Sequence, residues 1–280
     1  MGSMNSPTGT NWLILPLISS CDKNKTKTGR ESQSKSSPSL LLYLEFTGII
    51  PPMTSKSART LVLACATVME EMLPFLGKDM DHKILDFGLH VNPKELHRRL
   101  QDMIDKAGTE YGTIILGYGL CSLAVVGLRS NGCRLVIPRV DDCIGIFFGS
   151  RQAYRQQCLL EPGTYYLTRG WVEVGDTPFA EHERLVKKYG KEKAWKYYQA
   201  LMGKYKRLAY IKTGSPETGK FLEYARETAQ KYGLHFEELD GSPELVRKLL
   251  HGPWDAEIVV IKPGEICSLE LFLPDANLER

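Results

Sequence analysis

The 280-residue chain lacks any run approaching about 18 consecutive apolar residues, so a membrane-spanning helix is not expected. It also lacks an excess of one charge, because 36 basic residues face 33 acidic ones, and nucleic-acid binding gains no support. The motifs GxGxxG, GxSxG and HExxH and the P-loop are absent, which leaves ordinary nucleotide binding and serine or zinc-protease chemistry without a motif. The apolar fraction of 42% still suffices for a real core.

Cysteine is sparse, with seven residues, and no CxxC pair occurs among them. This spacing and the odd number argue against a secreted disulfide scaffold. A reducing cytoplasm, with free or metal-bound thiolates, is the simpler interpretation.

Residues 1–57 differ from the rest of the chain, because Ser, Lys, Thr and Pro dominate and no periodic apolar pattern is sustained. We expect this segment to be disordered or a non-native extension. Residues 1–4 resemble an expression-tag remnant, and Met53 is the expected natural start. Residues 18–21, ISSC, are similar to a bacterial lipoprotein processing site, but the positive residues required before the apolar run are missing.

From residue 58 onward strands and helices alternate, which predicts an α/β fold with a mostly parallel sheet flanked by helices. Two Rossmann-like lobes fit the pattern, the first over residues 58–176 and the second over residues 207–280. Between them, residues 177–206 read as a charged helical pair broken near Gly190. A solvated face is favoured over a partner surface for this connection.

The chain is organised around two apolar strands, Thr113–Tyr118 and Arg134–Pro138, each bounded by turn residues. A third candidate strand covers Thr60–Ala64. A cysteine follows each strand within a few residues, with Cys121 at the expected start of a helix and Cys143 in the first turn of a helix that reaches about residue 160.

The candidate strand Thr60–Ala64 runs directly into Cys65. Because the carboxyl ends of parallel strands meet at one edge of a sheet, we expect Cys65, Cys121 and Cys143 to converge there. Three thiolates leave a fourth position open on zinc, or hold a [4Fe–4S] cluster with one uncoordinated iron. The ligand type does not separate these two cases, and simple packing of the cysteines is the third interpretation.

Other polar residues follow the same predicted strand ends. His90 is a fourth metal ligand, a general acid or base, or a turn residue. Arg139 is suited to an anionic substrate group, and Asp141 or Asp142 to orienting a ligand or moving a proton. Helix capping and a surface ion pair are the alternative roles for these three residues.

Four residues are candidates for contact with a cofactor. Gly117 and Gly119 let the backbone leave the sheet in a conformation closed to most residues. Ser150 and Arg151, in the GSR stretch, could bind a phosphate, although we expect them inside or at the end of a helix and not at its N-terminus.

Several motifs occur in a fixed order: ILGYGLC at 115–121, VIPRVDDCI at 136–144, FGSR at 148–151 and PGTYYLTRGW at 162–171. Together with Cys65 after an alanine, and His90 and Pro93 in LHVNP, they resemble the DUF1638 family of anaerobic bacteria and methanogenic archaea, over roughly residues 58–262. The resemblance implies a cytoplasmic protein associated with corrinoid-dependent methyl transfer. It adds Tyr118 to the candidate catalytic residues, and Asp141 departs from the more usual histidine-like residue.

We therefore expect a cytoplasmic metal-binding protein with zinc held by three cysteines, acting on a small anionic or thiol substrate. His90, Tyr118, Arg139 and Asp142 are the candidate catalytic residues, and the reaction is expected to be a methyl transfer. The alternatives are a [4Fe–4S] enzyme of non-redox sulfur or Lewis-acid chemistry, and a non-catalytic accessory protein of a methyltransferase. Possible partners are a corrinoid protein or a methyltransferase. The sequence does not give the oligomeric state.

Overall fold

The computed structural model describes residues 59–108, 110–174, 177–214 and 218–273. These residues form an α/β fold with two sheets, as the alternation of strands and helices predicts. The expectations for residues 1–57 and for a start at Met53 lie outside the described residues.

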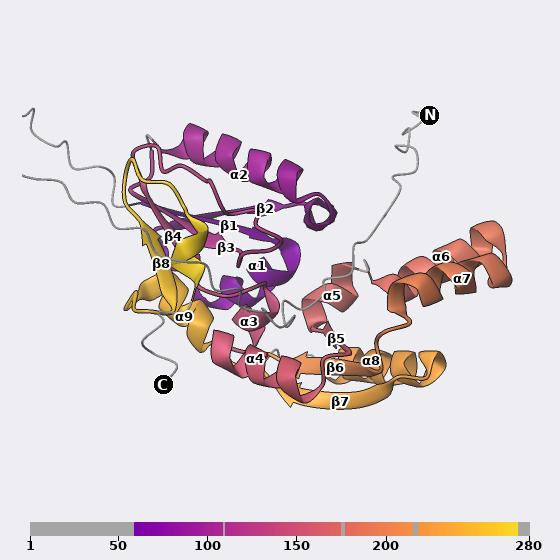
Figure 1. Ribbon diagram of the computed structural model, residues 1–280. Helices are drawn as coiled ribbons and strands as arrows, with labels where there is room; N and C mark the ends of the chain where they lie inside the picture. Colours follow the sequence, from indigo (N-terminus) through magenta and orange to yellow (C-terminus); the bar gives the residue numbers. More distant parts are fainter. Residues whose placement is uncertain (1–58, 109, 175–176, 215–217, 274–280) are drawn as a thin grey trace, which may run out of the picture.

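The larger sheet has the strand order β2-β1-β3-β4-β8 (Figure 1). The first four of these strands are mutually parallel, and β8 runs antiparallel to β4. The strand bounds are Thr60–Cys65 (β1), Met80–Leu85 (β2), Thr113–Gly117 (β3), Arg134–Pro138 (β4) and Ile258–Ile261 (β8).

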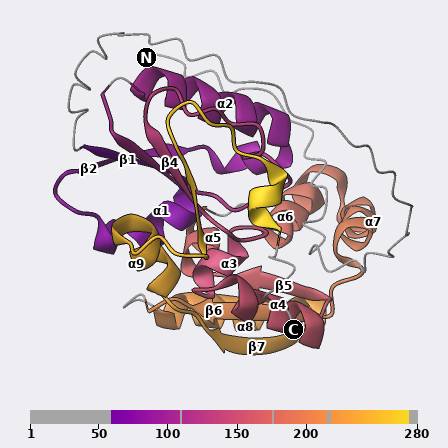
Figure 2. The ribbon, with the colours of Figure 1, turned by 60° about the vertical axis from the view of Figure 1, so that its left-hand side comes forward.

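Burial explains the order of these strands. Leu61 to Cys65 in β1 and Ile114 to Gly117 in β3 are buried without alternation, as expected of central parallel strands covered on both faces. β2 is mostly exposed and lies at the edge. Helix α2 covers one face, and helices α1 and α9 lie on the other (Figures 1 and 2). Their bounds are Pro93–Ala107 (α2), Ala66–Met72 (α1) and Glu244–His251 (α9).

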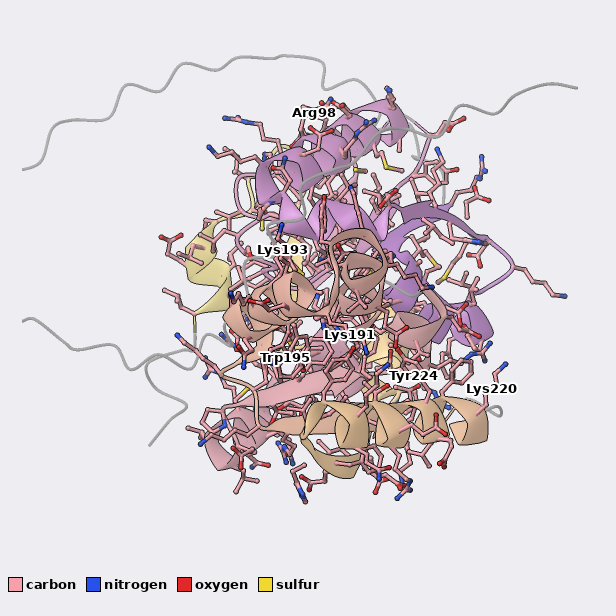
Figure 3. All side chains as sticks on the ribbon, turned by 90° about the vertical axis from the view of Figure 1, so that its right-hand side faces the viewer. Arg98, Lys191, Lys193, Trp195, Lys220 and Tyr224 are labelled. Atoms are coloured by element: carbon pink, nitrogen blue, oxygen red, sulfur yellow. The ribbon has the colours of Figure 1, made fainter. Side chains whose placement is uncertain are left out.

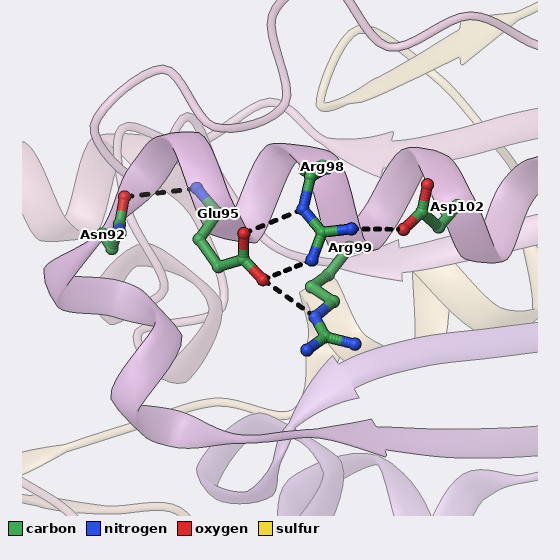
Figure 4. Close-up of polar contacts among 5 residues, drawn as sticks. All are labelled: Asn92, Glu95, Arg98, Arg99 and Asp102. Carbon is green, nitrogen blue, oxygen red and sulfur yellow. Dashed lines mark hydrogen bonds and ion pairs between the residues drawn. The ribbon is translucent and has the colours of Figure 1, made fainter.

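Helix α2 shows how local sequence defines an element. The Asn92 side chain accepts a hydrogen bond from the Glu95 backbone N–H at 3.2 Å, which caps the helix N-terminus. Glu95 then bonds to Arg98 and Arg99 one turn later, and Arg98 also reaches Asp102 (Figure 4). These ion pairs lie on the solvent side, so the apolar face of the helix packs on the sheet.

The smaller sheet contains three parallel strands in the order β5-β6-β7. Their bounds are Thr164–Leu167 (β5), Arg207–Lys212 (β6) and His235–Asp240 (β7), and α8, Thr218–Tyr232, packs on β6 and β7. The two sheets therefore do not follow the expected division into one lobe that ends at residue 176 and another that begins at residue 207. β5 pairs with β6 across the helical connection, and the last strand, β8, returns to the first sheet because its apolar residues pair along β4.

The single helix expected from residue 143 to 160 is two helices, α3 (Ile144–Phe147) and α4 (Arg151–Leu160). The break lies at Gly149, whose φ of 76° leaves the helical region, and Ser150 caps the second helix. The connection over residues 177–206 is a pair of helices broken at Gly190, as predicted. The remaining bounds are α5 Arg169–Val174, α6 Pro178–Tyr189, α7 Lys191–Met202, η1 Leu73–Phe75, η2 Phe87–Val91 and η3 Leu269–Phe272.

Within the described ranges, every helix is too short or too polar to span a lipid bilayer.

Candidate metal centre

The strands β1, β3 and β4 bring three cysteines to one edge of the larger sheet. Cys65 is the last residue of β1. Beyond β3 and β4 the two chain segments stay hydrogen-bonded, because the backbone N–H of Leu120 donates to Val140 O at 3.0 Å and that of Cys121 donates to Asp141 O at 3.2 Å. Cys121 therefore lies beside the segment that carries Cys143, as the sequence predicts.

All three thiols are buried, with exposed fractions of 0% for Cys65, 6% for Cys121 and 4% for Cys143. Burial is the main cause that raises the pKa of each thiol. For Cys121, the neighbouring Asp142 and then Cys65 raise the pKa further, and for Cys143 the neighbouring Cys121 and then Cys65 do so. The three sulfur atoms thus interact electrostatically, and the Thr67 hydroxyl lies 3.1 Å from the Cys65 sulfur.

The thiols are neighbours without forming a closed ligand set. In the described part of the chain, no three side chains of His, Cys, Asp or Glu stand close enough together to hold a metal ion. A bound ion would have to draw the three sulfur atoms nearer to one another. It would also favour their thiolate forms, which burial otherwise disfavours.

Tyr118 follows β3 directly, three residues before Cys121, and its hydroxyl is in an unusual position. The side chain is 1% exposed, and its buried oxygen has no hydrogen-bond partner within the described residues. Burial, and then Cys65, Cys121 and Cys143, raise its pKa well above the usual value. A buried hydroxyl without a partner costs about 1 to 3 kcal/mol, so a ligand that accepts its hydrogen bond fits this place.

His90, in η2, is the second unpartnered group. Its Nε2 atom is inaccessible to solvent and has no hydrogen-bond partner among the described residues, although the whole side chain is only partly buried. Its ring centroid lies 6.0 Å from that of Tyr118 and 5.1 Å from that of Phe87. Burial lowers the pKa of His90 to about 4, so the imidazole is neutral at pH 7 and free to act as a ligand or a hydrogen-bond partner.

The acidic pair after β4 has separate structural roles. Asp142 accepts hydrogen bonds from the Ile144 backbone and from the Tyr154 hydroxyl, both at 2.9 Å. Burial raises the pKa of Asp142 to about 6. Asp141 is paired instead with Arg151 at 2.6 Å and more loosely with Arg155 at 3.4 Å.

Of the basic candidates, Arg139 is half-buried, and its backbone N–H donates to Glu257 O at 2.7 Å. Arg151 donates to Phe272 O at 2.7 Å besides pairing with Asp141, so it ties helix α4 to the C-terminal segment. Ser150 was expected inside or at the end of a helix, and that expectation is wrong. Its hydroxyl accepts the Ala153 backbone N–H at 3.1 Å at the start of α4, which satisfies a group that a phosphate would otherwise bind.

The glycine that ends β3, Gly117, and the one two residues later, Gly119, permit close packing. A Cβ on Gly117 would stand 2.7 Å from the Ala64 Cβ of the neighbouring strand. A Cβ on Gly119 would stand 2.7 Å from Val140 O and 3.0 Å from the Asp142 Cα. Gly119 therefore lets the Cys121 and Cys143 segments lie against each other.

Cys121 does not begin a helix, contrary to the expectation. Cys121, Ser122 and Leu123 have φ angles of 43°, 59° and 68°, three consecutive residues in the left-handed region without a glycine among them. Each such residue costs about 1 to 2 kcal/mol, so the fold holds this cysteine in a strained turn.

This strain gives a first prediction. Because Leu123 is 53% exposed, Leu123→Gly loses little packing and relieves one left-handed residue. We expect the free energy of unfolding to rise by about 0.5 to 1 kcal/mol, measured by urea denaturation. The control is Leu159→Gly, an exposed leucine in helix α4, which we expect to lower the free energy of unfolding by about 1 kcal/mol. A loss of stability in both variants would show that Leu123 is not strained.

Helix α5, which follows β5, packs against helix α1, which begins directly after Cys65. Gly170 in α5 packs against Thr67 in α1, where a Cβ would stand 3.0 Å from the Thr67 Cα. The Trp171 ring lies 5.3 Å from that of Phe147 and 6.2 Å from that of Phe87, which in turn contacts His90. Sequence reasoning missed Thr67 and Trp171. Trp171 lies in the PGTYYLTRGW motif, and this was the one signal that could have found it.

The family model described as "Protein of unknown function (DUF1638)" matches residues 84–250, more than half of the chain. The chain belongs to the DUF1638 family. The match includes His90, Tyr118, Cys121 and Cys143, whereas Cys65 lies N-terminal to it. No curated protein and no solved structure matches the chain.

Proposed function

We propose that Cys65, Cys121 and Cys143 bind a metal ion at the carboxyl edge of the larger sheet. The observation that carries this proposal is the buried Tyr118 hydroxyl, which has no partner among the described residues and interacts electrostatically with all three thiols. A ligand shell of thiolates supplies acceptors for that hydroxyl. The proposal requires the three side chains to close around the ion, because they do not form a closed set of ligands on their own.

Zinc is the preferred ion of this proposal. Three thiolates leave its fourth position for a small anionic or thiol substrate, and zinc keeps a bound thiol ionised at neutral pH. In this arrangement Tyr118 would donate a hydrogen bond to a sulfur atom, and neutral His90, whose ring centroid lies 6.0 Å from that of Tyr118, would serve as a ligand or a hydrogen-bond partner. The Phe87 ring packs between those of His90 and Trp171, at 5.1 Å and 6.2 Å.

The reaction we propose is a methyl transfer to or from a thiol, in the cytoplasm, with a corrinoid protein or a methyltransferase as partner. This step rests on the resemblance of the motifs and on the thiolate set. Two alternatives use the same three cysteines. One is an enzyme with a [4Fe–4S] cluster, and the other is a non-catalytic protein that holds a cofactor for a methyltransferase.

Metal analysis of anaerobically purified protein tests the proposal. We expect about one zinc per chain and no inorganic sulfide, with no visible absorption. Iron with sulfide and a brown colour would keep the three-cysteine centre and replace zinc by a cluster. Protein that holds neither metal, and takes up neither zinc nor iron with sulfide on reconstitution, would overturn the proposal.

A further inference from the structure

The helices α6 and α7 form a hairpin that projects from the body of the protein (Figure 1). Its base is held by aromatic side chains. His182 Nδ1 lies 2.8 Å from the Tyr232 hydroxyl of α8, and the rings of Phe179 and Tyr198 lie 5.1 Å and 4.7 Å from that of Tyr232. The turn around Gly190 lies at the other end, and Trp195 reaches back to the aromatic cluster, with its ring 5.3 Å from that of Tyr198 and 5.8 Å from that of His182.

The turn end of the hairpin carries a high density of positive charge. Residues 187–196 contain five lysines and one glutamate, a formal charge of +4, whereas the whole chain has a formal net charge of +3. The rest of the chain is therefore close to neutral. A local charge of this kind, set against a neutral body, steers partners of opposite charge to one place.

These lysines are available for a partner. Within residues 187–196, Lys196 forms an ion pair with Glu192 at 2.9 Å. The other four lysines form no ion pair with any described residue. All four are exposed: Lys187, Lys188, Lys191 and Lys193. Two aromatic side chains lie in the same segment, Tyr189 at 53% and Trp195 at 42% exposed, and Lys191, Lys193 and Trp195 are labelled on the hairpin in Figure 3.

We propose that residues 187–196, here called the basic tip, dock an acidic surface of a partner protein. Tyr and Trp are the residues that most often anchor protein interfaces, and a surrounding ring of lysines selects an acidic partner and speeds its approach. Each of the two helices has 12 residues and is about 18 Å long. The hairpin therefore protrudes far enough to contact the surface of another protein.

A nucleic acid fits the basic tip less well. The cations are all lysines, without the arginines that bind phosphate through two parallel hydrogen bonds. The rest of the chain has a formal net charge of −1, so it adds no net positive charge to attract a phosphate backbone. This inference is independent of the metal centre.

The test is a binding assay with defined acidic polypeptides on the full chain. Fluorescently labelled poly-L-glutamate, a random copolymer of glutamate and tyrosine, and poly(U) RNA are each titrated at low and moderate salt. We expect both acidic polypeptides to bind, the copolymer more tightly because its tyrosines contact Tyr189 and Trp195, and both more tightly than poly(U). Affinity should fall as salt rises.

Two variants of equal net charge locate the binding surface. The tip variant reverses the four unpaired lysines, and the control variant reverses four exposed lysines elsewhere: Lys78→Glu, Lys83→Glu, Lys94→Glu and Lys106→Glu. We expect the tip variant to bind the acidic polypeptides at least about tenfold more weakly and the control to change by less than about threefold. Trp195→Ala should remove the preference for the tyrosine copolymer.

Three outcomes would overturn the inference. Equal weakening in both charge variants would mean that net charge, and not the basic tip, attracts the polypeptides. Tighter binding of poly(U) than of either acidic polypeptide would make a nucleic acid the occupant. Absence of binding by the unaltered protein would leave the basic tip a solvated face.

Discussion

Cys121→Ser will lower the affinity of the protein for zinc by more than about a hundredfold, and the purified variant will contain little metal. The variant removes one of the three thiols at the edge where β1, β3 and β4 end. Serine is close to cysteine in size but does not ionise at neutral pH, so it cannot replace a thiolate. Metal content per chain, with a competition titration against a chelator, measures the effect.

The matched controls are two buried cysteines away from that edge. Cys133 lies just before β4, at its amino end, and Cys267 pairs through its backbone with Leu128. Cys133→Ser and Cys267→Ser bring the same hydroxyl into a buried place, so they report the loss of stability alone. We expect both controls to retain the metal of the unaltered protein. If all three variants keep their metal, or all three lose it, the three-cysteine centre is wrong.

Much of the fold could be predicted because parallel strands and their helices leave a strong local pattern. The apolar strands β1, β3 and β4 were found within one residue, since each is buried on both faces and bounded by turn residues. The assignment of β5 and β8 to sheets could not be predicted. Both are short apolar strands, and which sheet they join depends on pairing with residues far away in the chain.

The convergence of the cysteines followed from one topological rule, that the carboxyl ends of parallel strands share an edge. Their surroundings did not follow from it. The left-handed turn at Cys121 contains no glycine, so the sequence does not indicate it. The break before Ser150 depends on the close approach of Gly149 to Ser242, which is far away in the chain. That the Tyr118 hydroxyl lacks a partner among the described residues is a property of the packed interior, which local sequence patterns do not contain.

The close contact between the segments that carry Cys121 and Cys143 predicts a large loss of stability when Gly119 is replaced. Gly119→Ala adds a Cβ that would lie 2.7 Å from Val140 O and 3.0 Å from the Asp142 Cα, and both of these are backbone atoms. Because backbone cannot rotate away as a side chain can, the segments after β3 and β4 must separate. We expect the free energy of unfolding to fall by about 2 to 3 kcal/mol in urea denaturation.

Gly219→Ala is the control for the same chemical change. Gly219 lies in the first turn of α8, and an added Cβ there meets no atom within 4 Å. Alanine should raise the free energy of unfolding by about 0.5 to 1 kcal/mol because it restricts the unfolded chain. The Gly119 variant should also bind zinc more weakly than the Gly219 variant, under conditions where both are folded, since separation of the two segments moves Cys121 from Cys143. A Gly119 variant as stable as the unaltered protein would contradict the close contact of the two segments on which the proposed metal centre depends.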